Sequence, residues 1–88
     1  MVMIMDEKTL RVLVENGAVK KVSIIGQGGI LHIEILTSAG NQSATTLKGS
    51  LKTWSSLDSA AKWVKSLGVG LINLNLEQWV PGQKAIKL

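Results

Sequence analysis

The sequence predicts an α+β fold: a single small domain, spanning residues 1–88, with an antiparallel sheet that carries two helices on one face. The length of 88 residues fits one domain. Glycines at four places divide the chain into six short segments. Residues 57–67 repeat apolar side chains at helical spacing, and residues 30–37 and 71–78 alternate apolar and polar side chains. The predicted order of elements is α-β-β-β-α-β.

The first segment, Asp6 to Asn16, is predicted to be a helix. Asp6 is a favourable N-cap residue, Met5 and Leu10 have the spacing of a hydrophobic staple, and Gly17 can end the helix. The alternative is a β-hairpin, because Asn16-Gly17 is a strong two-residue turn signal. That hairpin would place apolar side chains opposite charged ones on both sides of the ribbon, so the helix is favoured.

Three strands are predicted next, at Val19–Ile25, Ile30–Thr37 and Ala44–Trp54. The glycine-rich stretch Gly26–Gly29 lacks the Lys-Ser/Thr of a phosphate-binding loop and leads into a strand, so we interpret it as a turn. Gly49, inside the third strand, suggests a bulge or a close approach of backbone. Short glycine-bearing connections predict an antiparallel meander.

The second helix has the strongest sequence signals. It is predicted over Leu57–Leu67, with Ser56 available as N-cap and Gly68 as C-terminal stop. The strand that follows, Leu71–Gln78, alternates apolar residues with Asn and Glu and is ended by Pro81-Gly82.

This arrangement predicts which residues share each face of the sheet. The face under the helices is expected to hold Val22, Ile24, Leu31, Ile33, Ile35, Leu47, Leu51, Ile72, Leu74 and Leu76. The opposite face is expected to lie in water and to hold Lys21, Ser23, His32, Glu34, Thr46, Lys48, Ser50, Lys52, Asn73 and Asn75.

The net charge of +4 lies wholly in the second half of the chain, where residues 45–88 carry six lysines against two acids. A basic half suggests a polyanionic partner or an acidic protein surface, and it is also compatible with an ordinary soluble surface. The candidate contact residues are Lys48, Lys52, Lys62 and Lys65, with Trp54 and Trp63 as possible anchors. Tryptophans in so small a protein more often pack at the edge of the core than stack on bases.

The residues needed for catalysis are scarce. The chain has no cysteine and one histidine, His32, so it offers no Ser-His-Asp, Cys-His or multi-histidine arrangement. We expect His32 to be a surface residue of its strand. We therefore expect no enzyme, no cofactor and no metal. The apolar run Met1–Met5 is too short for a membrane span or a signal peptide, and a cytoplasmic location is expected.

Residues 52–81 carry a motif. Lys52 and Trp54 precede Ser-Leu-Asp-Ser-Ala-Ala at 56–61, and an amphipathic helix, Leu67-Gly68 and a closing strand follow. This pattern resembles the small ParC-family, partition-associated proteins of plasmids and integrated conjugative elements, in which phenylalanine is more usual at Trp54 and arginine at Lys52. The resemblance implies an accessory role in maintaining or partitioning a mobile element, with no catalytic residue.

The leading hypothesis is a non-enzymatic accessory protein that binds DNA or a partition protein. The rival hypothesis is a structural or oligomerisation module that binds no nucleic acid. In either case we expect a homodimer, because the core is small and the strand edges between Ile30 and Leu36 lack proline and are short of charge.

Overall fold

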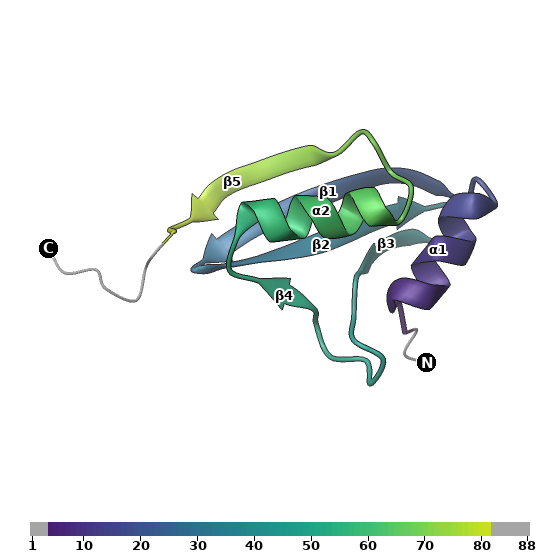
Figure 1. Cartoon of the computed structure of the whole chain (residues 1–88), viewed down its shortest axis with the longest axis horizontal. Helices are drawn as coiled ribbons and strands as arrows, with labels where there is room; N and C mark the ends of the chain where they lie inside the picture. The colour runs from purple at the N-terminus through teal and green to yellow at the C-terminus, as the bar shows by residue number, and fades with distance from the viewer. Residues whose placement is uncertain (1–3, 82–88) are drawn as a thin grey trace, which may run out of the picture.

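The computed structural model describes residues 4–81, and it confirms the α+β class. Its elements in chain order are α1 (Glu7–Glu15), β1 (Val19–Gly28), β2 (Ile30–Thr37), β3 (Gly40–Ser43), β4 (Thr53–Trp54), α2 (Leu57–Ser66) and β5 (Asn73–Trp79). Figure 1 shows α2 lying across one face of the sheet, with α1 at one end of it.

The sheet is mixed, with the strand order β3-β2-β1-β5 and with β4 paired to β2. The antiparallel meander is confirmed for β1, β2 and β3. The expectation of an entirely antiparallel sheet is wrong, because β5 runs parallel to β1, with Ile24 opposite Leu74. The cause is the α2 connection: β4 already runs in the direction of β1, and a helical crossover lets β5 run the same way.

The third strand differs from the prediction over Ala44–Trp54. Pairing with β2 begins earlier, in β3, and ends with a hydrogen bond from the Ala44 amide to the Ile33 carbonyl oxygen at 2.9 Å. A loop follows that is closed by a single bridge between Thr45 and Leu51. Gly49 turns this loop rather than making a bulge, since its φ of 91° is one that side-chain-bearing residues rarely adopt. Only the two residues of β4 then return to β2.

Both helices are capped as their sequences predict. The Asp6 carboxylate accepts a hydrogen bond from the Thr9 amide at 3.1 Å, and the Ser56 hydroxyl accepts one from the Ser59 amide at 3.2 Å. Gly17 follows α1 with a φ of 70°. The helix interpretation of the first segment is confirmed, and the hairpin alternative is wrong.

A single core joins the helices to the sheet. Its buried members are Met5, Leu10, Val22, Ile24, Leu31, Ile33, Ile35, Ala44, Ala60, Val64 and Leu67. The predicted core positions of β1 and β2 are thus confirmed.

Three leucines that were expected in this core are exposed instead. Leu47 and Leu51 are 75% and 47% exposed because they belong to the loop before β4 and not to a strand. Leu74 is 51% exposed because β5 is the outer strand, while α2 packs closest against β2 and β4.

β2 lies inside the sheet, and two predictions about this strand are therefore wrong. The strand edges expected between Ile30 and Leu36 are already paired, with β1 on one side and β3 and β4 on the other. His32, predicted to be a surface residue, is only 9% exposed. It is opposite Ile25 on one side and Thr53 on the other, on the sheet face that lies away from α2.

β1 is longer than predicted, and Gly26 lies inside it rather than in a turn. A Cβ atom at Gly26 would collide with Cβ and Cγ of Trp79, so the glycine leaves room for the Trp79 side chain to pack against β1. The turn is made only by Gly28, whose φ is 61°, and Gly29. Trp79, the third tryptophan, is therefore held by its packing against Gly26.

Candidate functional site

Trp54 and Trp63 form an aromatic pair on the α2 side of the molecule. Their ring centroids are 5.0 Å apart with an angle of 50° between the planes. The Lys52 ammonium lies 5.4 Å from the centroid of Trp54 and 5.7 Å from that of Trp63. We call these three residues the tryptophan–lysine cluster. Each cation–π contact of this kind contributes roughly 0.5–1 kcal/mol at an exposed site.

The cluster forms where β4 leads into α2. Trp54 ends β4, opposite Leu31 of β2, and Trp63 lies on the second turn of α2. Both rings are half-buried and pack against the core. The prediction that the tryptophans pack at the edge of the core is thus confirmed, and only their outer surfaces face solvent.

Glu7 and Arg11 border the cluster and tie α1 to α2. Arg11 donates from Nε and Nη2 to Glu7 Oε2 at 3.2 and 2.9 Å, and from Nη1 to the carbonyl oxygen of Ser66 at 2.9 Å. The last contact satisfies a carbonyl at the end of α2. The hydrogen bond from Arg11 is the main cause that lowers the pKa of Glu7 below 4.5, helped by the positive charge of Arg11, by Trp63 and by Lys52.

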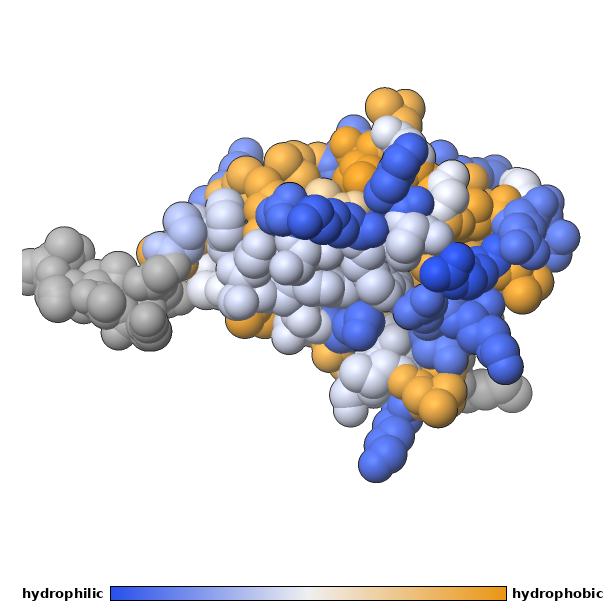
Figure 2. Space-filling view, in the orientation of Figure 1, coloured by the Kyte–Doolittle hydropathy of each residue, from blue (hydrophilic) through white to orange (hydrophobic). Residues whose placement is uncertain are grey.

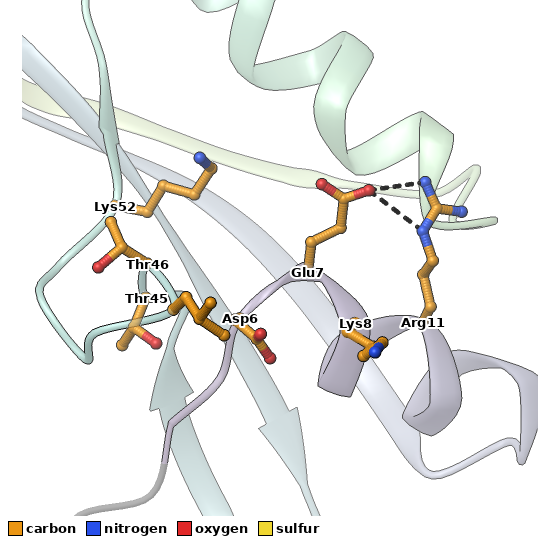
Figure 3. A pocket seen from close by; sticks show the side chains of 8 residues that line it. Asp6, Glu7, Lys8, Arg11, Thr45, Thr46 and Lys52 are labelled. Atoms are coloured by element: carbon orange, nitrogen blue, oxygen red, sulfur yellow. Dashed lines mark hydrogen bonds and ion pairs between the residues drawn. The ribbon is translucent and has the colours of Figure 1, made fainter.

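A wide-mouthed hollow of about 600 Å³ opens beside this cluster, between α1 and the loop before β4 (Figure 3). Its lining residues are Asp6, Glu7, Lys8, Arg11, Thr45, Thr46, Leu47 and Lys52. Asp6 is engaged in capping α1, and Glu7 is held by Arg11. Lys52 has no carboxylate within 4.0 Å in the part of the chain that the structure describes, so its charge is available to an anionic group.

The outer face of α2 carries two further candidate lysines. Lys62 pairs with Asp58 at 3.1 Å, and both side chains are about three-quarters exposed. Lys65 is exposed in the last turn, where the helix dipole favours a positive charge. Figure 2 shows hydrophilic side chains projecting from this side of the molecule.

The structure brings together most of the predicted contact residues, but not all. Lys52, Trp54 and Trp63 are in contact, and Lys62 and Lys65 stand on the same helix as Trp63. Lys48 does not join them, since it lies at the turn of the loop between Thr45 and Leu51.

Two residues of this region, Arg11 and Glu7, were not predicted. Arg11 reaches Ser66 across 55 positions of sequence. The only local signal was the Glu7/Arg11 spacing, which is that of an i,i+4 ion pair on a helix.

No group of three or more His, Cys, Asp or Glu side chains is placed to hold a metal within residues 4–81. His32 Nε2 lies 3.3 Å from Glu34 Oε2 on the sheet face away from α2. Neither described helix is long and apolar enough to cross a membrane.

Comparisons with known proteins found no match to this chain among protein-family models, curated proteins or solved structures. The resemblance of residues 52–81 to ParC-family proteins therefore stays a prediction from the sequence motif.

The carboxylates at the start of α1 predict a loss of stability in acid. The Thr9 side chain and amide lower the pKa of Asp6 below 3.8, and Arg11 lowers that of Glu7. A lowered folded-state pKa stabilises the fold above the unfolded value, and this contribution is lost as the pH falls through the folded value. We expect the melting temperature to fall as the pH is lowered from 5 toward 3, and Glu7→Gln to flatten that fall. A Glu7→Gln profile identical to that of the parent protein would contradict this account.

Proposed function

We propose that this chain is a non-enzymatic accessory protein that binds DNA through the α2 side of the molecule. The observation that carries the proposal is the gathering of Lys62 and Lys65 on α2 with the tryptophan–lysine cluster. These residues belong to the half of the sequence that holds the whole net charge. Lysine ammonium groups are suited to phosphate contacts, and the exposed parts of indole rings are suited to stacking on bases.

The chemistry of this surface favours weak binding with little sequence preference. The single arginine, Arg11, already directs its guanidinium to Glu7 and Ser66, so the usual bidentate reader of guanine is occupied. The Lys62–Asp58 pair is well exposed, and such pairs contribute little to stability, so a phosphate can displace Asp58. Affinity then depends mainly on lysine–phosphate contacts.

The resemblance of residues 52–81 to ParC-family proteins supports a role in maintaining or partitioning a plasmid or conjugative element. In that role the DNA contact would be an accessory one. The alternative partner is a partition protein with an acidic surface, and a failure to bind DNA would favour it.

The test is a titration of labelled single- and double-stranded DNA at low salt, followed by fluorescence anisotropy. Changing Lys62 and Lys65 together to Gln should weaken binding by about tenfold or more, because two phosphate contacts are lost. The matched control changes the exposed Lys20 and Lys21 of β1 to Gln, which removes the same charge, and we expect a much smaller effect.

Two results would count against the proposal. One is the absence of binding to either DNA at roughly 100 μM protein, where non-specific binders are still detected. The other is an equal loss of affinity in both double variants, which would mean that affinity for DNA depends on the net charge of the protein and not on the lysines of α2.

A further inference from the structure

The hollow between α1 and the loop before β4 has walls that are held in place by hydrogen bonds. The Thr46 amide donates to the Ser50 carbonyl oxygen at 2.8 Å, and the Gly49 amide donates to that of Thr46 at 2.9 Å. At the base of the loop, the Thr45 amide donates to the carbonyl oxygen of Met5, ahead of α1, at 2.9 Å. The loop and the start of α1 are thus tied together, and a ligand that enters between them pays little for ordering the site.

The walls of this hollow are mainly apolar. Most of the exposed lining surface belongs to carbon atoms, and the volume of about 600 Å³ lies within the range of small-molecule sites, roughly 300–1,000 Å³. Leu47 contributes a side chain that is 75% exposed and takes no part in the core. A ligand with a flat apolar face would cover this leucine and remove apolar surface from water.

The polar groups of the lining offer both donors and acceptors. Thr45 and Thr46 each accept a backbone hydrogen bond through Oγ1, and a hydroxyl used in this way can still donate. Asp6 and Glu7 add carboxylate oxygens, which disfavour an acidic peptide or a phosphate inside the hollow. The lining therefore suits an uncharged group with apolar faces and hydrogen-bonding edges, which is the chemistry of a nucleobase.

Lys52 connects this hollow with the tryptophan–lysine cluster. Its side chain lines the hollow, where Figure 3 shows it opposite Glu7, and its ammonium lies 5.4 Å from the ring centroid of Trp54. A DNA strand that places a phosphate on this ammonium therefore has both the tryptophan rings and the hollow within reach of its neighbouring bases.

We infer that the hollow receives one unpaired base of single-stranded DNA, whose phosphate contacts Lys52. The inference rests on the proposed DNA binding and specifies the form of the nucleic acid, because a base enters such a hollow only when it is released from pairing. The contact is made to the base and adds no phosphate contact, so it strengthens binding without changing the salt dependence.

The test compares the native protein with Leu47→Asn by fluorescence anisotropy on three labelled DNAs. These are a thymidine oligonucleotide, the same strand paired with its complement, and a strand of equal length without bases. Leu47→Asn should weaken binding to the thymidine strand about threefold to tenfold, because apolar contact with the base is lost at unchanged charge. On the duplex and on the strand without bases, the variant and the native protein should bind alike.

Leu71→Asn is the matched control. Leu71 is 85% exposed, lies in the connection between α2 and β5 and does not line the hollow. This variant should bind all three DNAs as the native protein does. Since both leucines are on the surface, both variants should also melt near the parent temperature.

Two results would overturn the inference. One is an unchanged affinity of Leu47→Asn for the thymidine strand, and the other is an equal loss on the duplex or on the strand without bases. In either case, weaker binding after changing Lys62 and Lys65 to Gln would leave the proposed function intact. Absence of binding of the native protein to every DNA would overturn the proposed function and this inference together.

Discussion

Ala60→Asp is expected to abolish cooperative unfolding. Ala60 is fully buried on the inner face of α2, beside Val64 and the core residues of the sheet. A carboxylate there would be larger than the methyl group it replaces and would lie unpaired in an apolar core. We expect a loss of more than about 4 kcal/mol, comparable with the whole stability of a small domain. A thermal melt followed by circular dichroism checks this.

Ser59→Asp is the matched control for that experiment. Ser59 is the preceding residue, is exposed, and lies near the start of α2, where the helix dipole favours a carboxylate. It should melt near the parent temperature. Two indistinguishable melts would mean that α2 buries a different face. Ala61 also belongs to the apolar residues of α2, but it is only partly buried, so its substitution should be milder.

Leu10→Ala is expected to have the second largest effect. Leu10 is the one buried residue of α1 and is completely enclosed. Its truncation leaves a cavity and removes apolar surface from the core, which costs about 2–5 kcal/mol. The urea midpoint should fall accordingly.

Val12→Ala, two positions along the same helix, is the control for this second prediction. Val12 is 50% exposed, so we expect a change within about 0.5 kcal/mol. Equal effects of the two substitutions would contradict the docking of α1 through Leu10.

The helices were predictable because their signals are local. Asp6 and Ser56 cap α1 and α2 through amides three residues further on, and the apolar stripes have the helical period. The alternation of β2 likewise identified its core face. Each of these features depends on residues within a few positions of one another.

The pairing of the strands was less predictable because it depends on distant contacts. Nothing local in β5 distinguishes a parallel from an antiparallel neighbour; the direction follows from the α2 crossover. For the same reason β2 was taken for an available edge, whereas β3 and β4 both pair with it. The four residues of β3 looked like a joining loop because they contain glycine and few apolar side chains.

In the candidate site, too, the contacts between residues close in sequence were predictable and the contacts between distant residues were not. Lys52 and Trp54 are close in sequence, and Trp63 follows one helix turn and a half after the start of α2, so their association could be anticipated. The approach of Arg11 to Ser66 could not, since it arises only when α1 and α2 pack on the same core. It is this contact that removes the single arginine from the residues available to a partner.

The measurement that tests DNA binding most directly is the salt dependence of affinity. If Lys52, Lys62 and Lys65 each contact a phosphate, the logarithm of the binding constant should fall with the logarithm of salt concentration at a slope of about −3. Changing Lys62 and Lys65 together to Gln should bring the slope to about −1, because each lost phosphate contact removes about 0.9 from it. A native slope near zero, or an unchanged slope in the double variant, would contradict DNA binding through the α2 side of the molecule.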